Sequence, residues 1–394
     1  MKLASRIAHI ELSPTFRINA AARALAAQGV DVLDFSVGEP DFPTPPAAKE
    51  AGKAAIDGDV TKYTANEGTL ELRRAIAAKL LRDNGLTYAP DAILASPGAK
   101  SSLYCAVLAL FSPGDEVLVP SPYWVSYPEQ IRLSGATPVV VPTRESAGFK
   151  LTAAELDAAC TVSTRGLLLN YPSNPTGACY DAGELAAIAE VARRRDLVVI
   201  ADEIYEKLLF DGRTFTSIAS VSDDAYGRTV VVNGVSKSFA MTGWRLGYAA
   251  GPKEIVDAMA KVQSHTTSHP ASISQVAAQA ALADSEGDVR RMAAKFAERR
   301  EVIVEGIGSL PGVTLVPPAG AFYVYPNVAG LFGREIGGRT VRSGQDVAEA
   351  LLAAARIAVV PGEAFGTTHH VRLSFACSMS RIREGIARLQ AALA

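Results

Sequence analysis

The sequence has few features that would point to a disulfide framework, a membrane protein or a nucleic-acid-binding protein. Its 394 residues include only 4 cysteines, and none of them forms a Cys-x-x-Cys pair. The longest apolar run, 103–111, is too short to cross a bilayer. The 39 basic and 41 acidic residues nearly balance, which gives no bulk attraction for nucleic acid or an anionic membrane. We therefore expect a soluble, cytoplasmic protein without nucleic-acid or membrane partners.

Metal and nucleotide motifs are missing as well. His265 and His269 have i, i+4 spacing, but no carboxylate lies near them in the sequence and Pro270 follows, so no metal site is expected. There is no Walker sequence and no Gly-x-Gly-x-x-Gly after a strand, which disfavours a nucleotide cofactor. The chemistry has to be sought in other residues.

The apolar pattern predicts an α/β protein. From about residue 68, short apolar runs alternate with helical stretches such as 182–195, and the runs are apolar at successive positions rather than at every second one. Strands of this kind are buried on both faces, which is typical of a mostly parallel, mixed sheet between helices. The predicted strands are 92–96, 117–120, 166–170, 197–203, 229–233 and 246–250.

The pattern changes beyond about residue 285, which predicts a smaller α+β domain. We expect an N-terminal segment (1–47) that packs with the small domain, a large cofactor-binding domain (48–285) and a small C-terminal domain (286–394). Predicted small-domain strands are 313–316, 322–325, 357–360 and 371–375, with helices at 288–309, at 346–355 and from Ser380.

Polar residues at the ends of the predicted strands are the candidates for function, because ligands of open parallel sheets bind outside the carboxyl ends of the strands. Asp202 ends one apolar run, Lys237 follows the next, and Arg245 comes shortly after it. The turn 96–102 joins a strand to an apolar helix whose N-terminus could bind a phosphate.

Each of these features also has an ordinary structural explanation. Asp202 could cap the next helix, Lys237 could lie at the surface, Arg245 could form a surface ion pair, and the turn could be merely tight. Together, however, they supply a carboxylate for a protonated pyridine nitrogen, a buried amine and two phosphate contacts. This combination predicts a site for pyridoxal 5′-phosphate (PLP).

Seven ordered segments resemble the class I aminotransferases of PLP fold type I. The stretch 236–247 resembles the lysine signature of that family, and 170–177 resembles its Asn-Pro-x-Gly turn. The other matching segments are 38–42, 62–64, 121–124, 201–205 and 370–374. The resemblance runs from about residue 11 to the end of the chain.

The resemblance implies roles for the matching residues. Lys237 would bind the cofactor covalently and move a proton between the substrate Cα and the cofactor C4′, while Asp202 would keep the pyridine nitrogen protonated. Tyr205 and Asn174 would hydrogen-bond the phenolic oxygen of the ring, and Trp124 would stack on it. The predicted phosphate ligands are Gly98, Ala99, Lys100, Ser236, Arg245 and, from the partner of a homodimer with shared active sites, Tyr63.

The substrate follows from the same resemblance. Arg372 would bind the α-carboxylate, with Gly38, Trp124 and Asn174 nearby. Lys100 corresponds to a lysine that one bacterial branch of aspartate aminotransferases uses for the distal carboxylate, although it could simply point to solvent. The same branch has hydroxyls where Ser13 and Thr15 stand. The resemblance therefore implies ping-pong transfer between L-aspartate and 2-oxoglutarate.

Several alternatives remain open. Glu11 stands where prephenate-using members carry a basic residue, which argues against prephenate. A pocket wall near Tyr127 and Phe322 could nevertheless admit aromatic substrates. Gly234 replaces a serine that often binds phosphate in other aminotransferases, and 265–269 lacks the distal arginine that some members supply from the neighbouring subunit. A PLP-dependent C–S lyase would share the same motifs. A PLP-sensing transcription regulator is disfavoured, because no basic helix-turn-helix precedes Gly38.

Overall fold

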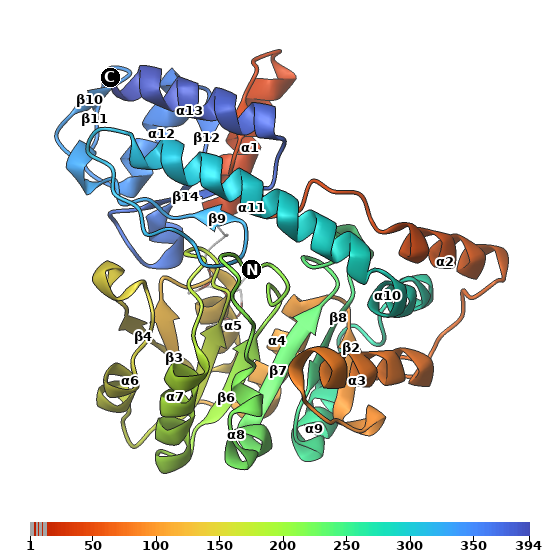
Figure 1. Ribbon diagram of the computed structural model, residues 1–394. Helices are drawn as coiled ribbons and strands as arrows, with labels where there is room; N and C mark the ends of the chain where they lie inside the picture. Colours follow the sequence, from red (N-terminus) through yellow and green to blue (C-terminus); the bar gives the residue numbers. More distant parts are fainter. Residues whose placement is uncertain (1–3, 5–6, 8–9, 11–13) are drawn as a thin grey trace.

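The computed structural model describes residues 4, 7, 10 and 14–394, and these form two lobes (Figure 1). The lower lobe is built on a seven-stranded sheet, and the upper lobe contains a three-stranded sheet flanked by helices. The long helix α11 (Glu286–Gly308) runs from the lower lobe into the upper one (Figure 1). In the described part of the chain, no helix is long and apolar enough to cross a membrane.

The seven-stranded sheet has the order β2-β8-β7-β6-β5-β3-β4. All neighbouring strands are parallel except at β8, which runs antiparallel to both β2 and β7. The predicted mostly parallel, mixed sheet is therefore confirmed. Its strands are β2 (Ile93–Ser96), β3 (Glu116–Ser121), β4 (Thr137–Pro142), β5 (Thr164–Asn170), β6 (Val198–Asp202), β7 (Thr229–Gly234) and β8 (Gly247–Ala250).

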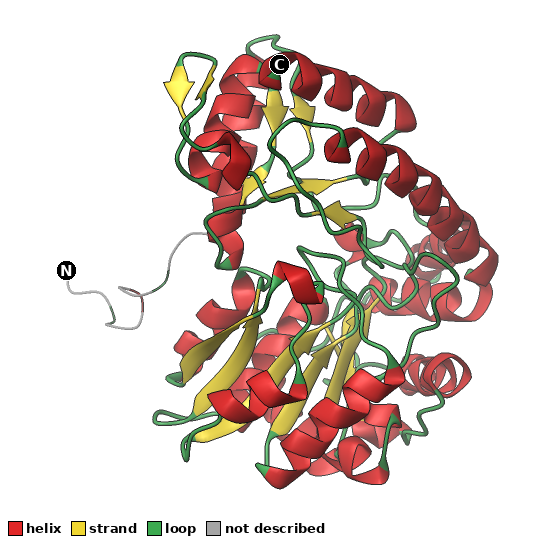
Figure 2. Ribbon diagram, turned by 60° about the vertical axis from the view of Figure 1, so that its left-hand side comes forward, coloured by secondary structure: helices red, strands yellow, loops and turns green. Residues whose placement is uncertain are grey.

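Helices cover both faces of this sheet, as Figure 2 shows. Along the central strands, alternate residues join different hydrophobic clusters. Leu168 and Ile200 pack in the cluster that includes residues of α4 and α9, whereas Leu167 and Val199 pack with α6 and α7. Burying such a side chain stabilises the fold by about 1.5–3 kcal/mol. The helices of this lobe are α2 (Pro46–Asp57), α3 (Leu70–Asn84), α4 (Ala99–Leu110), α5 (Ser126–Ser134), α6 (Ala153–Ala159), α7 (Ala182–Arg194), α8 (Asp223–Arg228), α9 (Lys253–Ser264) and α10 (Ser272–Asp284).

The upper lobe has its own hydrophobic core, which includes Phe296, Phe322 and Phe375. Its three-stranded sheet has the order β13-β14-β9, and β1 pairs in parallel with β12. The strands are β1 (Leu33–Asp34), β9 (Tyr323–Val324), β10 (Glu335–Ile336), β11 (Arg339–Thr340), β12 (Ile357–Ala358), β13 (Val360–Pro361) and β14 (Val371–Ser374). The helices besides α11 are α1 (Pro14–Ala27), α12 (Gly344–Ala354) and α13 (Met379–Leu393).

Two predicted strands need correction, and one strand of the large sheet was missed. The edge strand β4 was not predicted, because its sequence is largely exposed and has prolines at 138 and 142. The predicted strand 313–316 is wrong: only Thr314 forms an isolated bridge, and the following Pro317 and Pro318 lack N–H donors. The predicted strand 357–360 is divided between β12, which pairs with β1, and β13, which pairs with β14.

Candidate active site

A cavity of about 480 Å³ lies at one edge of the seven-stranded sheet. The strands β2, β6 and β7 end at this edge, and the antiparallel strand β8 begins there, so that Ser96 and Gly234 both pair with Gly247. Arg245 therefore reaches the edge from the start of a strand, while Asp202 and Lys237 reach it from strand ends. The predicted residues that line the cavity are Gly38, Ala99, Lys100, Trp124, Asn174, Asp202, Tyr205, Ser236, Lys237, Arg245 and Arg372.

Lys237 supplies the amine of the cavity. Its Nζ donates to the backbone carbonyl of Gly38 at 2.5 Å and lies 5.9 Å from the centroid of the Tyr205 ring. Burial, helped by the positive charge of Arg372, lowers the pKa of Lys237 to about 8. A lysine with a pKa of about 8 is about one-tenth neutral at pH 7, far more than an ordinary lysine, and a neutral amine can act as a nucleophile or a base.

Asp202 supplies a buried carboxylate at the end of β6. It is 4% exposed, and burial raises the pKa of Asp202 to about 6. Its Oδ2 accepts from the Tyr127 hydroxyl at 2.7 Å, and its Oδ1 accepts from the Ile204 amide at 3.3 Å. Within residues 14–394 no salt bridge involves Asp202, so a cationic N–H group in the cavity would have a carboxylate to bind.

The first turn of α4 and Arg245 together make an anion site. Gly98 precedes α4 with φ +89°, and no side chain caps this helix. A Cβ at Gly98 would lie 2.6 Å from Nη2 of Arg245, so the guanidinium packs directly against the glycine. The amides of the first turn and the arginine fork are both suited to a phosphate. Gly234, in contrast, has no room for a serine side chain, because its Cβ would lie 2.8 Å from Cα of Gly247.

Arg372 of β14 brings a buried guanidinium from the upper lobe to the cavity. It is 3% exposed, and burial lowers its pKa. Nη1 donates to Oδ1 of Asn174 at 2.9 Å and Nη2 donates to the Ser36 carbonyl at 2.6 Å, while Nε has no partner among the described residues. No carboxylate of the described chain forms an ion pair with it. A buried cation of this kind is suited to an incoming carboxylate.

Lys100 and Trp124 lie together at another part of the cavity wall. Nζ of Lys100 lies 4.8 Å from the centroid of the Trp124 ring. Burial lowers the pKa of Lys100, and the charge of Arg245 adds to this effect. No acidic residue in the described part of the chain neutralises Lys100, so the cavity has a second cation for an anionic ligand.

The sequence did not predict the contacts that Tyr323 and Asn170 make in the site. The Tyr205 hydroxyl lies 2.8 Å from the Tyr323 hydroxyl, and a Cβ at Gly38 would come within 2.6 Å of that same Tyr323 oxygen. Asn170 accepts from the Asn174 amide at 2.9 Å and donates to the Asp202 carbonyl at 2.9 Å. The sequence signal for Asn170 was its place at the end of β5; Tyr323 had none.

Gly98 and Tyr63, two of the predicted site residues, are not among those that line the cavity. Tyr63 is 94% exposed and contacts the His269 ring edge to face. Ser13 and Glu11 lie outside the described residues, and of Thr15 the structure describes only its position in α1. Of the two residues expected near the pocket wall, one lines the cavity, and the ring of the other lies 5.9 Å from Nζ of Lys237. Tyr127 lines the cavity, but Phe322 is fully buried in the upper core and does not.

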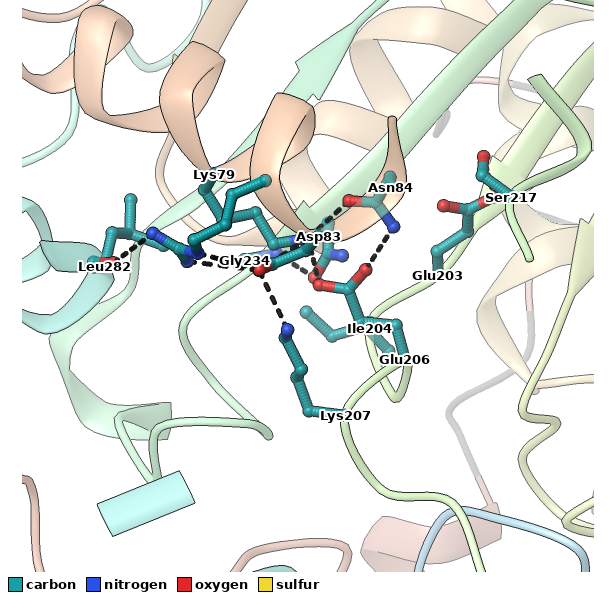
Figure 3. Close-up of polar contacts among 12 residues, drawn as sticks. Lys79, Asp83, Asn84, Glu203, Ile204, Glu206, Lys207, Ser217, Gly234 and Leu282 are labelled. Atoms are coloured by element: carbon teal, nitrogen blue, oxygen red, sulfur yellow. Dashed lines mark hydrogen bonds and ion pairs between the residues drawn. The ribbon is translucent and has the colours of Figure 1, made fainter. Parts of the chain in front are cut away.

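A cluster of buried polar and charged side chains connects the segment after β6 to α3 (Figure 3). Glu206 forms an ion pair with Lys79 of α3 and accepts from Asn84 at 2.8 Å. Lys79 also donates to Oδ1 of Asn84 at 2.8 Å. Asp202 and Tyr205 line the cavity, whereas Glu206, from the same short segment, forms an ion pair with Lys79. This segment therefore contributes to the site and is also attached to α3.

Comparisons with known proteins agree with this geometry. The family model described as aminotransferase class I and II matches residues 30–389. The chain is 45% identical over 391 residues to the aspartate/prephenate aminotransferase of Cereibacter sphaeroides, covering 99% of this chain and 98% of that protein. It is 44% identical over 389 residues to the aspartate aminotransferase of Geobacillus stearothermophilus, covering 99% of this chain and 98% of that protein.

Solved structures of aspartate aminotransferases also have the fold of this chain. The aspartate aminotransferase of Rhizobium meliloti superposes with a TM-score of 0.96 at 42% identity, covering 100% of this chain and 99% of that one. The Thermus thermophilus aspartate aminotransferase with maleate superposes with a TM-score of 0.94 at 40% identity, and both chains are covered completely. The fold expected from the resemblance is therefore confirmed, and this chain belongs to the class I and II aminotransferase family.

Proposed function

We propose that this protein is a PLP-dependent aminotransferase that transfers the amino group of L-aspartate to 2-oxoglutarate. One observation carries the proposal: the cavity joins a low-pKa lysine, a buried carboxylate and three further cations, Lys100, Arg245 and Arg372, without ion-pair partners in the described chain. Aspartate and 2-oxoglutarate each have two carboxylates. The relatives named above as aspartate aminotransferases, one of them with maleate, support a dicarboxylate substrate.

The residues present fit PLP. Asp202 is a buried carboxylate without a salt bridge in the described part of the chain, which suits a protonated pyridine nitrogen. Gly98 leaves space where a side chain would meet Arg245, at a helix start suited to a phosphate. Trp124 would cover one ring face, and Tyr205 and Asn174 would bind the phenolic oxygen. When bound, PLP supplies an aldehyde that reacts with amines and a ring that accepts electrons from the substrate Cα.

The residues of this chain would do the remaining work. Arg372 would bind the α-carboxylate in a bidentate pair, and Lys100 would bind the distal one. This leaves Cα facing Lys237, whose amine would take the proton from Cα and return it at C4′ of the cofactor. Asp202 would hold the proton on the pyridine nitrogen throughout. Reversal of these steps with 2-oxoglutarate completes a ping-pong cycle.

The remaining parts of the proposal concern assembly. Tyr63 is an exposed aromatic residue, and other exposed apolar side chains, including Ile56, Val60 and Leu70, lie close to it in the sequence, which suits a surface covered by a second subunit. We propose a cytoplasmic homodimer in which Tyr63 of one chain binds the phosphate in the other. Within each chain, the large domain is 48–285, and the segment 1–47 packs with the small domain 286–394, as the β1–β12 pairing suggests.

The test is an absorbance scan of the purified protein with PLP during addition of L-aspartate and then 2-oxoglutarate. We expect the visible band of lysine-bound PLP to shift with aspartate and to return with the oxo acid. Lys237→Ala should lose this response, and full turnover by that variant would contradict the mechanism. A band that ignores aspartate would reject Lys100 as the specificity residue. Prephenate is the second candidate substrate, because the Cereibacter sphaeroides relative is named for it; release of pyruvate and ammonia would instead indicate a lyase.

A further inference from the structure

The Tyr127 hydroxyl is the side-chain group that contacts Asp202 most directly. Tyr127 lies in the first turn of α5, 2% exposed, and its hydroxyl donates to Oδ2 of Asp202 at 2.7 Å. The Trp124 ring packs against it edge to face at 5.3 Å between centroids. Because burial raises the pKa of Tyr127 well above its ordinary value, the hydroxyl stays protonated and remains a donor throughout the working pH range.

We propose that Tyr127 is a positioning residue, whose hydroxyl keeps Asp202 ionised and oriented so that the proton of the ion pair stays on the cofactor's pyridine nitrogen. This inference rests on the proposed PLP chemistry. Its physical basis is competition for one proton between a carboxylate and a pyridine nitrogen in a dry site. Burial favours the neutral pair, with the proton on Asp202, whereas a hydrogen bond to the carboxylate favours the charged pair.

The surroundings of Asp202 leave few other groups for this task. The Ile204 amide donates to Oδ1 at the longer distance of 3.3 Å. The titratable groups that act on Asp202 are Tyr127 from α5, Lys237 after β7 and Tyr205 from its own segment. Lys237 would be bonded to the cofactor, and the Tyr205 hydroxyl contacts Tyr323 instead. Tyr127 is therefore the side-chain hydrogen-bond donor on which the ionisation of Asp202 depends within the described chain.

The test is the pH titration of the cofactor absorbance in the holoenzyme of Tyr127→Phe. Without the hydroxyl, the proton moves toward Asp202 and the ring loses positive charge. The nitrogen that joins Lys237 to the cofactor then becomes more basic. We expect the absorbance midpoint to rise by about one to two pH units, as the loss of a hydrogen bond to a charged group implies. We expect kcat to fall about 10-fold or more, with little change in KM.

Tyr180→Phe is the matched control. Its hydroxyl is also buried and accepts from the Leu151 amide at 2.8 Å, but it does not line the cavity. This variant should keep the native midpoint. A second variant, 3-fluorotyrosine at position 127, has a stronger donor with nearly the same shape and should move the midpoint down. It remains informative if Tyr127→Phe does not fold.

Two outcomes separate the inference from the function on which it rests. If native protein with PLP gives no visible band, the proposed function fails. If the band is present but both substitutions at position 127 leave its midpoint unchanged, only this inference is overturned, and Tyr127 serves packing alone. The ¹⁵N chemical shift of the pyridine nitrogen in labelled PLP gives a readout independent of turnover, and it should move toward the unprotonated value in Tyr127→Phe.

Discussion

Replacing Lys79 by methionine should destabilise the protein strongly, although Lys79 does not line the cavity. Lys79 is 1% exposed and pairs with Glu206, which is 4% exposed (Figure 3). Another acidic residue nearby, Asp83, keeps Lys207 at 2.9 Å and Arg82 at 2.8 Å in the variant. Among the described residues, Glu206 then keeps the Asn84 amide as its side-chain partner, so the substitution leaves a buried carboxylate without an ion-pair partner there.

The magnitude follows from that uncompensated charge. Breaking a buried pair by removing one partner costs about 3–5 kcal/mol. Glu206→Gln should cost less, because Lys79 would still donate to Asn84 at 2.8 Å and lie 3.8 Å from Asp83. The double variant should be more stable than Lys79→Met alone, since it removes the unpaired carboxylate. This order of the three variants is specific to the contacts around Glu206.

The measurement is urea unfolding of the four proteins at one protein concentration and one cofactor loading, followed by circular dichroism. Lys53→Met is the control, because Lys53 pairs with Glu50 in an exposed position and its loss should not change the midpoint measurably. Equal midpoints for native protein and Lys79→Met would refute the reasoning. Additive effects in the double variant would show that the two charges are not coupled.

The remaining predictions concern the cavity. Arg372→Lys keeps the charge but loses the bidentate fork. In steady-state assays with aspartate, kcat/KM should fall roughly 30-fold or more, which corresponds to about 2 kcal/mol of transition-state stabilisation. An unchanged kcat/KM would reject Arg372 as the carboxylate ligand. Gly98→Ala should weaken PLP binding at least about 10-fold by equilibrium titration, because its Cβ would press on Arg245 and its φ is positive. Gly85→Ala, also at positive φ but in open space, should leave PLP affinity unchanged. In the cofactor-free protein the folded-state pKa of Lys237, about 8, lies below that of an unfolded lysine, about 10.4. Thermal unfolding should therefore show stability rising from about pH 8 to 10, and Lys237→Met should lose this rise.

Local sequence indicated six of the seven strands of the large sheet and much of the candidate site. The continuous apolar runs identified strands buried on both faces, because a strand between two helical layers needs apolar side chains at every position. The same rule predicted that Asp202 and Lys237 would meet, since parallel strands end at one edge of the sheet. It missed β4, whose exposed positions and prolines resemble a loop.

The sequence alone therefore indicated most of the chemical groups of the candidate site, whereas the tertiary structure decided their pairings. The roles of Arg372 and Asn174 were expected only from the family resemblance, and the hydrogen bond between their side chains spans 198 residues and both lobes. Neither the Tyr127–Asp202 hydrogen bond nor the Lys79–Glu206 ion pair leaves a pattern in the sequence. Periodicity reports whether a side chain is buried, but its partner depends on strand order and on how helices cross the sheet, and these are set by packing of the whole chain.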